Sequence, residues 1–273
     1  MNLDVSIIVS TYNRPEALYL VLRNICLQMD NDSEVIVADD GSTSETQKCI
    51  QQIKGEFPKC KIHHVWQADQ GFRLARIRNL AVKSAKGEYL IFLDGDCIPS
   101  PHFIKKHKFL REPGWTVYGQ RILIGKKYTN ELERSIKNRK KEVPFGLFRL
   151  VVCRLKGRIN RISPVIYFPF PLFRKNQSEN WKHIRGCNWG MWKRDYEKVN
   201  GCDESFQGWG SEDKDLAVRL LNYGIKIKNG KFGPYVLHLW HEKADRNADA
   251  KKMELVEYRR RNKITLPKKG MSD

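Results

Sequence analysis

The sequence predicts an α/β fold with a mainly parallel central sheet flanked by helices. Four short apolar segments alternate with three amphipathic ones between residues 5 and 96. The apolar segments have the length and β-branched content of strands, whereas the others carry apolar residues at helical spacing. This alternation is the βαβ pattern of a parallel sheet. Polar residues cluster just after each expected strand, at the edge where open α/β sheets bind ligands.

The first half of the chain supplies these elements in order. Strands and helices alternate at 5–13, 15–28, 34–42, 44–53, 61–67, 74–85 and 88–96, beginning and ending with a strand. Pro15 stands at the start of the first helix, where its missing N–H group is tolerated. No glycine-rich phosphate-binding motif (GxGxxG or GxxxxGK[ST]) follows a strand, so the dinucleotide-binding and P-loop versions of the fold are disfavoured.

The rest of the chain divides into a basic insert, a second compact half and a tail. The insert holds 15 Lys and Arg against 4 Glu between residues 126 and 182, which is +11 of the chain's net charge of +19. The second half is rich in Gly and Trp and contains an expected helix at 216–224. The tail after His241 is polar, and we expect it to be helical near its end. The expected divisions are 1–125, 126–183, 184–243 and 244–273.

Charge, cysteine content and hydropathy restrict the class of protein. Fifty Lys and Arg against 31 Asp and Glu predict attraction to nucleic acid, anionic lipid or a phosphorylated substrate. Seven cysteines are never spaced as CxxC, which argues against a disulfide framework or a zinc-cysteine site. No run of about 18 apolar residues could span a bilayer, and the N-terminus lacks the basic leader of a signal peptide. We therefore expect a cytoplasmic protein with reduced thiols.

Two aspartates one residue apart, Asp94 and Asp96, end the fourth expected strand. Carboxylates at this spacing can reach one divalent cation and suit Mg²⁺ or Mn²⁺, while Gly95 between them admits a phosphate. The alternative is a solvated turn. Two later histidines, His238 and His241, would complete with Asp96 a mixed nitrogen and oxygen shell suited to Mn²⁺. A histidine on its own is usually structural, so the pair carries more weight than either member.

A second set of candidate residues follows the second and third strands. Asp40 can accept a hydrogen bond from a base N–H or a ribose hydroxyl, or it can belong to a helix N-cap and turn. Arg73, Arg76 and Arg78 precede the fourth strand, and arginine forks suit diphosphate oxygens. Phe72 beside them can stack on a flat ring. The alternative for each arginine is a basic helix face in solvent.

Residues 208–216 read GWGSEDKDL, which places three carboxylates directly after an exposed tryptophan. The two glycines let Trp209 lie open for stacking on a sugar ring. Glu212 and Asp213 can bind sugar hydroxyls, and one of them can act as a general base toward an attacking hydroxyl. The alternative is that Ser211 or Asp213 caps the helix that follows. Capping uses one side chain and leaves the other acids unexplained.

In their order along the chain, these motifs resemble the family 2 glycosyltransferases of the GT-A fold. The resemblance rests on VSIIVSTYNR, VADDGS, the basic helix that contains RN, and DGD, and it covers roughly residues 3–125 and 184–243. GWGSED followed by HLWH is similar to the C-terminal motif of the β-1,4-galactosyltransferases and bacterial chondroitin-type polymerases. The fold and site that this resemblance implies are therefore those of a nucleotide-sugar-dependent transferase.

The resemblance also implies a role for each site residue. The nucleotide-binding residues would be Ser10, Tyr12, Arg14, Asp40, Phe72, Arg76, Asp94 and Gly95, with Asp40 on the uracil edge. The metal ligands would be Asp96, His238 and His241. The galactosyltransferase pattern has a methionine where His238 stands, so the metal preference here departs from it. Asp213 would be the catalytic base, and Glu212 and Trp209 would grip the acceptor sugar.

The implied reaction is inverting, metal-dependent transfer of a hexose or N-acetylhexosamine from a UDP-sugar to a glycan hydroxyl. The setting would be bacterial lipopolysaccharide or surface polysaccharide synthesis, with Mn²⁺ or Mg²⁺ as cofactor. We expect the insert to hold the enzyme on the anionic cytoplasmic face of the inner membrane. A subdomain covering the acceptor cleft and a dimer interface are the alternatives for it.

Three other classes compete with this interpretation. A nucleic-acid-binding protein would fit the charge, but the chain has no helix-turn-helix, zinc finger or RNP signature. A non-catalytic sugar-binding relative would not require the DGD motif, the Glu212–Asp213 pair and the two histidines together. A nucleotidyltransferase would normally have a Gly-rich phosphate loop near the N-terminus, and STYNRPEA does not supply one.

Overall fold

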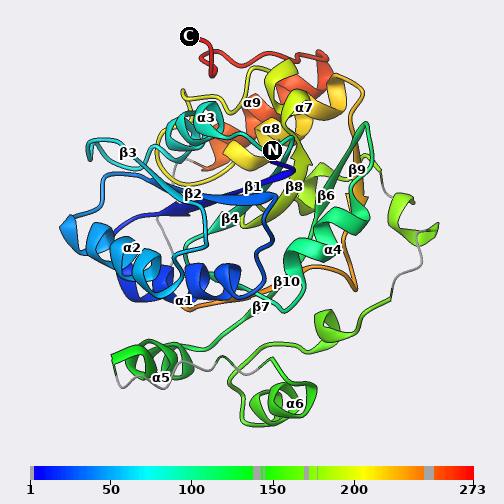
Figure 1. Cartoon of the computed structure of the whole chain (residues 1–273). Coiled ribbons are helices and arrows are strands. Elements are labelled where there is room, and N and C mark those ends of the chain that lie inside the picture. Colours follow the sequence, from blue (N-terminus) through cyan, green and yellow to red (C-terminus); the bar gives the residue numbers. More distant parts are fainter. Residues whose placement is uncertain (1–2, 138–142, 144, 169–171, 177, 243–248) are drawn as a thin grey trace.

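A seven-stranded sheet lies between two layers of helices in the computed structural model, which describes residues 3–137, 143, 145–168, 172–176, 178–242 and 249–273 (Figure 1). The strands, given in spatial order, are β3 (Ile62–Trp66), β2 (Ser33–Asp39), β1 (Val5–Thr11), β4 (Tyr89–Asp94), β8 (Asn188–Trp192), β6 (Trp115–Tyr118) and β9 (Lys226–Asn229). The first four are mutually parallel, and β8 is antiparallel to both of its neighbours. The mainly parallel α/β fold predicted from the sequence is therefore confirmed.

Helices cover both faces of this sheet. One face carries α1 (Pro15–Cys26), α2 (Ser44–Glu56) and α4 (Phe103–Leu110), and the other carries α3 (Leu74–Ser84), α7 (Lys193–Lys198), α8 (Glu212–Asn222) and α9 (Asp249–Arg261). Strand β1 shows why both layers form, because its side chains alternate between the two faces. Val5, Ile7 and Val9 pack in the first hydrophobic core, while Ile8 packs in the second.

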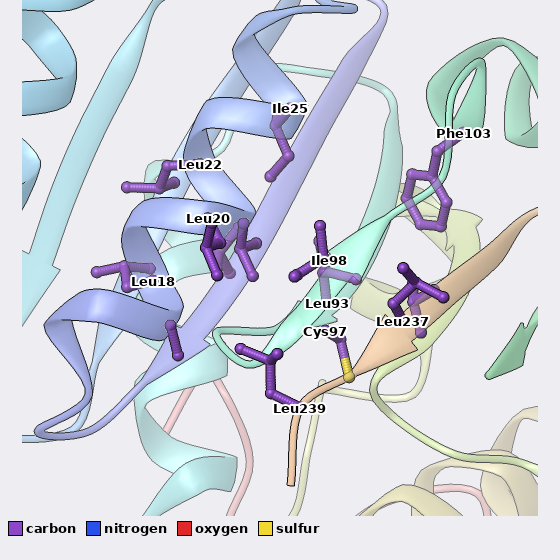
Figure 2. Close-up of a cluster of buried hydrophobic side chains, with 14 of the residues drawn as sticks. Leu18, Leu20, Leu22, Ile25, Leu93, Cys97, Ile98, Phe103, Leu237 and Leu239 are labelled. Carbon is purple, nitrogen blue, oxygen red and sulfur yellow. The ribbon is translucent and has the colours of Figure 1, made fainter. Parts of the chain in front are cut away.

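A small second sheet extends the first core. It consists of β5 (Cys97–Pro99), β10 (Tyr235–His238) and β7 (Gln120–Leu123), with β10 in the middle. Figure 2 shows Leu20 and Ile25 of α1 beside Ile98 of β5, with Leu237 and Leu239 of the β10 segment across from them. The helical spacing that predicted a helix at 15–28 therefore corresponds to a buried apolar face. This packing fixes β10, and so the segment that carries the two histidines, against the end of β4.

The described residues of the basic insert form two helices, α5 (Lys126–Lys137) and α6 (Leu147–Leu155), and three short 3₁₀ turns, Ser163–Val165, Leu172–Lys175 and Trp181–His183. Tyr128 and Leu132 of α5 and Leu150 of α6 are buried in the first core. Both helices lie at the lower end of the molecule in Figure 1, away from α9. Residues 138–142, 144, 169–171, 177 and 243–248, which include parts of the insert and of the tail, lie outside the described residues.

All seven cysteines are free, as expected from their spacing. Within the described ranges, no helix is both long enough and apolar enough to cross a bilayer.

The C-terminal helix α9 is fixed to α8 by a buried ion network. Arg259 contacts Asp215 and Asp203, each at 2.6 Å, and Arg219 contacts Asp215 at 2.8 Å. Both aspartates are fully buried, and Val256 of α9 is buried in the second core. Breaking such a pair leaves a charge that has lost its partner inside the protein. The tail of the chain is therefore an integral part of the fold.

We expect Arg259→Met to lower the free energy of unfolding by roughly 3 kcal/mol. This is the lower end of the usual cost of breaking a buried pair, because Arg219 still contacts Asp215. The matched control is Arg261→Met, at an exposed arginine of the same helix, for which a loss below about 0.5 kcal/mol is expected. Urea unfolding followed by circular dichroism measures both. Equal losses in the two variants would contradict a buried network.

Candidate active site

The carboxyl ends of the parallel strands bring the predicted donor-side residues together. In the sheet register Ser10 of β1 stands opposite Asp94 of β4, and Thr11 stands opposite Asp39 of β2. Asp40 follows at once, because its N–H group donates to the carbonyl of Thr11. The predicted strands were one to three residues too long at this edge, since the last residues of each run leave the ladder and form the loops of the site.

Asp96, His238 and His241 form a group that could hold a metal ion. Cys97 pairs with His238 where β5 meets β10, which places this histidine beside Asp96. The Nε2 atoms of His238 and His241 lie 3.5 Å and 3.6 Å from the Asp96 carboxylate. One ligand atom from each residue lies within 4.8 Å of the others. One carboxylate and two imidazoles suit Mn²⁺, so the donor set fits the expected ion.

The charges around Asp96 favour its ionised form. Burial acts to raise its pKa, but the hydrogen bond and the charge of His238, together with Arg14 and His241, outweigh burial and lower it. Burial acts in the opposite sense on His238, and Asp96 outweighs it to raise the pKa of that imidazole. The ionised Asp96 therefore lies against a fixed positive charge, the Arg14 guanidinium at 2.9 Å.

A second group close enough to share an ion among the described residues is Asp94 with Cys97 and Cys187. Both thiols are buried, and thiolates suit softer metals than Mn²⁺. The mixed imidazole and carboxylate group is the better candidate for the metal implied by the DGD motif.

Arg14 links Asp96 to the basic insert. Its guanidinium lies 2.9 Å from Asp96 and 3.0 Å from Glu133 of α5, and it also donates to the carbonyl of Trp240. The resemblance implies a place for Arg14 in the nucleotide pocket; the structure brings its side chain to the metal carboxylate. The insert is thereby connected directly to the candidate metal group.

The expected base-binding residues line one part of the same edge. Asp40 is nearly buried, which raises its pKa, and its two oxygens accept hydrogen bonds from the Gln67 side chain and the Arg73 N–H. Tyr12 and Phe72 leave 48% and 40% of their surface exposed, so both rings are available for stacking. Asp39, by contrast, accepts from the Ser42 N–H and forms the turn that was the alternative interpretation of ADDGS.

Gly95 is required by packing as well as by any phosphate. A Cβ atom added there would lie 2.9 Å from the carbonyl oxygen of Ser10 and 3.0 Å from the hydroxyl of Thr11. The close approach of β1 therefore excludes larger residues between the two aspartates. From the sequence, the expected reason for this glycine was access of a phosphate. The packing reason could not be predicted there, because Ser10 and Thr11 are distant from Gly95 in the chain.

Arg78 is a site residue that the sequence analysis did not single out from its basic neighbours. It is buried, lies 3.1 Å from Asp94 and 3.8 Å from Glu212, and donates to the Ser10 hydroxyl. Arg76, the residue implied by the resemblance, instead contacts Gln67 and lies 3.9 Å from Glu204. Helical spacing could have indicated that Arg78 is buried and Arg76 is not. Arg78 shares the apolar face of α3 with Ala75 and Val82, which are also buried.

Glu212 and Asp213 begin α8 and face Arg78 from the second half of the chain. Glu212 is largely buried, and its Oε2 atom has no hydrogen-bond partner among the described residues. Burial and the charge of Asp213 raise the pKa of Glu212 to about 7, although Arg78 opposes them. Asp213 accepts a hydrogen bond from the Gly186 N–H at 3.1 Å. Asp94, Arg78 and the two acids thus join the carboxyl end of β4 to the start of α8.

The alternative role of this motif as a helix cap was wrong in detail. Ser211 occupies the N-cap position of α8, but its side chain makes no capping bond and instead donates to Asp249 of α9. Asp215, the third acid, forms ion pairs with Arg219 and Arg259. Of the three carboxylates, one is structural and two remain for the site. Trp209 precedes them with 37% of its surface exposed.

The chain belongs to glycosyl transferase family 2, whose sequence profile matches residues 6–199. A second profile, described as the N-terminal domain of galactosyltransferase, matches residues 173–242. The first match covers the candidate donor and metal aspartates, and the second covers the acidic motif and both histidines. The resemblance stated from the motifs is confirmed, and the protein is a member of a family of glycosyltransferases.

Two similar proteins are polysaccharide synthases. Chondroitin synthase of Escherichia coli is 28% identical over 238 residues, which cover 82% of this chain and 33% of that protein. Hyaluronan synthase of Pasteurella multocida is 27% identical over 234 residues, covering 83% of this chain and 24% of that protein. The chain therefore spans only about a third or a quarter of these relatives.

Solved structures confirm the GT-A fold. GalNAc-T7 with UDP, GalNAc and Mn²⁺ superposes with a TM-score of 0.63 over 94% of this chain and 48% of that one, at 14% identity. The mannosyltransferase PcManGT of Pyrobaculum calidifontis, in complex with GDP-Man and Mn²⁺, gives a TM-score of 0.59 over 87% of this chain and 57% of that one, at 18% identity. At these identities the likeness concerns the fold alone.

We expect Glu212→Gln to remove a pH-dependent loss of stability. The pKa of Glu212 is about 7 in the folded protein, above its ordinary value of 4.5. The folded state therefore binds more protons between these values, and stability falls as pH rises through that window, by an amount on the order of 3 kcal/mol. The glutamine side chain does not ionise, so the variant lacks this loss of stability.

Urea unfolding of both proteins in EDTA at pH 5 and pH 8 tests this prediction. Wild type should lose more stability than the variant between the two pH values. The same pH dependence in both proteins would show that Glu212 ionises normally.

Proposed function

We propose that this protein is an inverting, metal-dependent glycosyltransferase that moves a hexose or N-acetylhexosamine from a UDP-sugar to a hydroxyl of a glycan acceptor. The observation that carries the proposal is the arrangement around Arg78. On one side Arg78 contacts Asp94 and the Ser10 hydroxyl, close to the residues that could hold a metal, and on the other side it lies 3.8 Å from Glu212. Family membership supports the reaction class, and the geometry supports the assignment of each side.

The donor would bind along the carboxyl edge of the sheet. Asp40 would accept a hydrogen bond from the uracil, with Tyr12 and Phe72 offering ring faces. Ser10 and Asp94 would lie on the ribose side, and Arg76 would reach phosphate oxygens from the exposed face of α3. Asp96, His238 and His241 would hold Mn²⁺ or Mg²⁺, which when bound would offset the negative charge of the diphosphate.

The protein's own groups would then direct a single displacement at the anomeric carbon. Asp213 would accept the proton of the acceptor hydroxyl as its oxygen attacks from the face opposite the diphosphate. The Gly186 N–H holds the Asp213 carboxylate in place. Glu212 would accept a hydrogen bond from a neighbouring sugar hydroxyl through its unpartnered oxygen, and Trp209 would stack on the ring. Positioning of this kind can contribute about 7–11 kcal/mol.

The setting we propose is bacterial lipopolysaccharide or surface polysaccharide synthesis, which the two synthase relatives support. The basic insert would act there as a peripheral anchor on the cytoplasmic face of the inner membrane. Helix α6 carries Leu147, Phe148 and Leu155 with exposed fractions of 59%, 80% and 82%. Arg149, Arg154 and Lys156 accompany them along the sequence. Exposed apolar and basic side chains on one helix suit an anionic bilayer interface.

We expect UDP release from one member of a panel of UDP-sugars in the presence of Mn²⁺, and loss of that release in EDTA or in Asp96→Ala. GDP-mannose is tested beside the panel as a control for recognition of the nucleotide base. The acceptor is a mixture of methyl hexosides and N-acetylhexosaminides. Turnover of GDP-mannose alone would overturn the UDP assignment. Full activity of Asp96→Ala would overturn the metal assignment.

Replacing Asp213 with Asn should lower kcat by about 10²–10⁴-fold and leave the affinity for UDP and Mn²⁺ unchanged, because only proton transfer is removed. Asp249→Asn would not serve as a control, since that residue contacts the same loop. The matched variant is Asp30→Asn, at an exposed aspartate that precedes β2, at the end of this strand away from the site. Near-normal turnover of Asp213→Asn would exclude it as the base.

Phe148→Ser combined with Leu155→Ser should weaken co-sedimentation with vesicles that contain anionic phosphatidylglycerol, because two insertable side chains are lost. The control is Leu266→Ser, at a leucine that is 56% exposed near the C-terminus. Binding should also fall in high salt and on uncharged vesicles. Unchanged binding of the double variant would favour the alternatives, a cleft cover or a dimer interface.

A further inference from the structure

The acceptor loop, residues 208–211, has a backbone that its own sequence does not stabilise. Gly208, Gly210 and Ser211 have φ angles of +73°, +103° and +68°. Glycine adopts such angles readily, but serine does so only under constraint from its surroundings. Because Glu212 and Asp213 follow directly, the path of this loop decides where both acids and the Trp209 ring lie.

The first turn of α9 supplies that constraint. Lys252 Nζ donates to the carbonyl oxygens of Gly208 and Trp209, at 2.9 Å and 3.0 Å. Asp249 accepts a hydrogen bond from the Ser211 hydroxyl at 2.6 Å. A Cβ atom added to Gly210 would lie 2.8 Å from the same Asp249 carboxylate, so the helix is packed directly on the loop.

Contacts at both ends make this loop a bridge between two fixed parts. On the donor side, the Gly208 N–H donates to the carbonyl of Phe72 at 2.9 Å. On the other side, α9 is itself held by Arg259 and by the buried Val256. The loop therefore has a rigid support at each end, and the support given by α9 comes from two polar side chains one helical turn apart.

We propose that Asp249 and Lys252 are positioning residues of the acceptor side, acting through the 208–211 loop on Trp209, Glu212 and Asp213. The kinetic effect of these residues rests on the proposed function, whereas their support of the loop does not depend on it. The tail of the chain, which the sequence presented as a polar appendage, thus sets the geometry of acceptor binding. In the described part of the chain, Asp249 and Lys252 bond to the loop and to none of the candidate donor residues, so we expect donor affinity to be retained.

Lys252→Met tests this inference in the full-length protein. It should raise KM for the acceptor about ten-fold and also lower kcat, because the loop sets the position of Asp213, with little change in the affinity for UDP and Mn²⁺. The probe acceptor is the methyl glycoside that wild type turns over best. Lys252→Arg should restore acceptor KM, since an arginine can also donate to both carbonyls. Lys251→Met, at the exposed neighbouring lysine, is the matched control.

Hydrogen–deuterium exchange of peptides that span residues 205–216 provides a readout without turnover. Lys252→Met and Asp249→Ala should each speed exchange in these peptides and leave peptides of β1 and β4 unchanged. Unchanged exchange at the loop, or equal losses of donor and acceptor affinity, would overturn the inference. If wild type turns over no glycoside, the proposed reaction fails while the exchange data still decide whether α9 holds the loop.

Discussion

A buried arginine between carboxylates from the two halves of the chain is the interaction on which the site depends. Arg78 lies 3.1 Å from Asp94, at the end of β4, and 3.8 Å from Glu212, at the start of α8. In a low-dielectric interior, these acids would repel one another without a cation between them. Removing the arginine would leave the largely buried Glu212 without its cationic partner. The carboxyl end of β4 and the start of α8 are therefore held together by electrostatics.

The rest of the architecture serves to keep these charged groups in place. The parallel register of β1 and β4 sets Ser10 against Asp94. The small second sheet brings His238 to Asp96, and the buried Asp215 anchors α8 through Arg219 and Arg259. Each of these devices joins segments that are far apart in the sequence. A single domain built in this way can hold the groups at the distances that catalysis requires.

The distribution of charge also separates two tasks. The carboxylates gather at the carboxyl edge of the sheet and at the start of α8, where a neutral sugar and a metal ion would bind. The excess of Lys and Arg is concentrated in the insert, whose α6 exposes large apolar side chains beside them. Arg14 and Glu133 connect the insert to the metal carboxylate. A membrane-bound insert would thus place the site close to a surface-linked acceptor.

The sequence by itself determined the fold class, the position of the parallel strands and the main candidate residues. Strand and helix periodicity depends on neighbours two to four positions away, so it can be read directly, and motifs such as DGD and GWGSED are contiguous. Four features were decided only by tertiary structure: the contact of Arg78 with Glu212, the crowding of Gly95 by Ser10, the ion pair of Asp215 with Arg259, and the support of the 208–211 loop by α9. Each depends on a partner from a distant segment, and local sequence carries no record of which distant groups will share a low-dielectric environment.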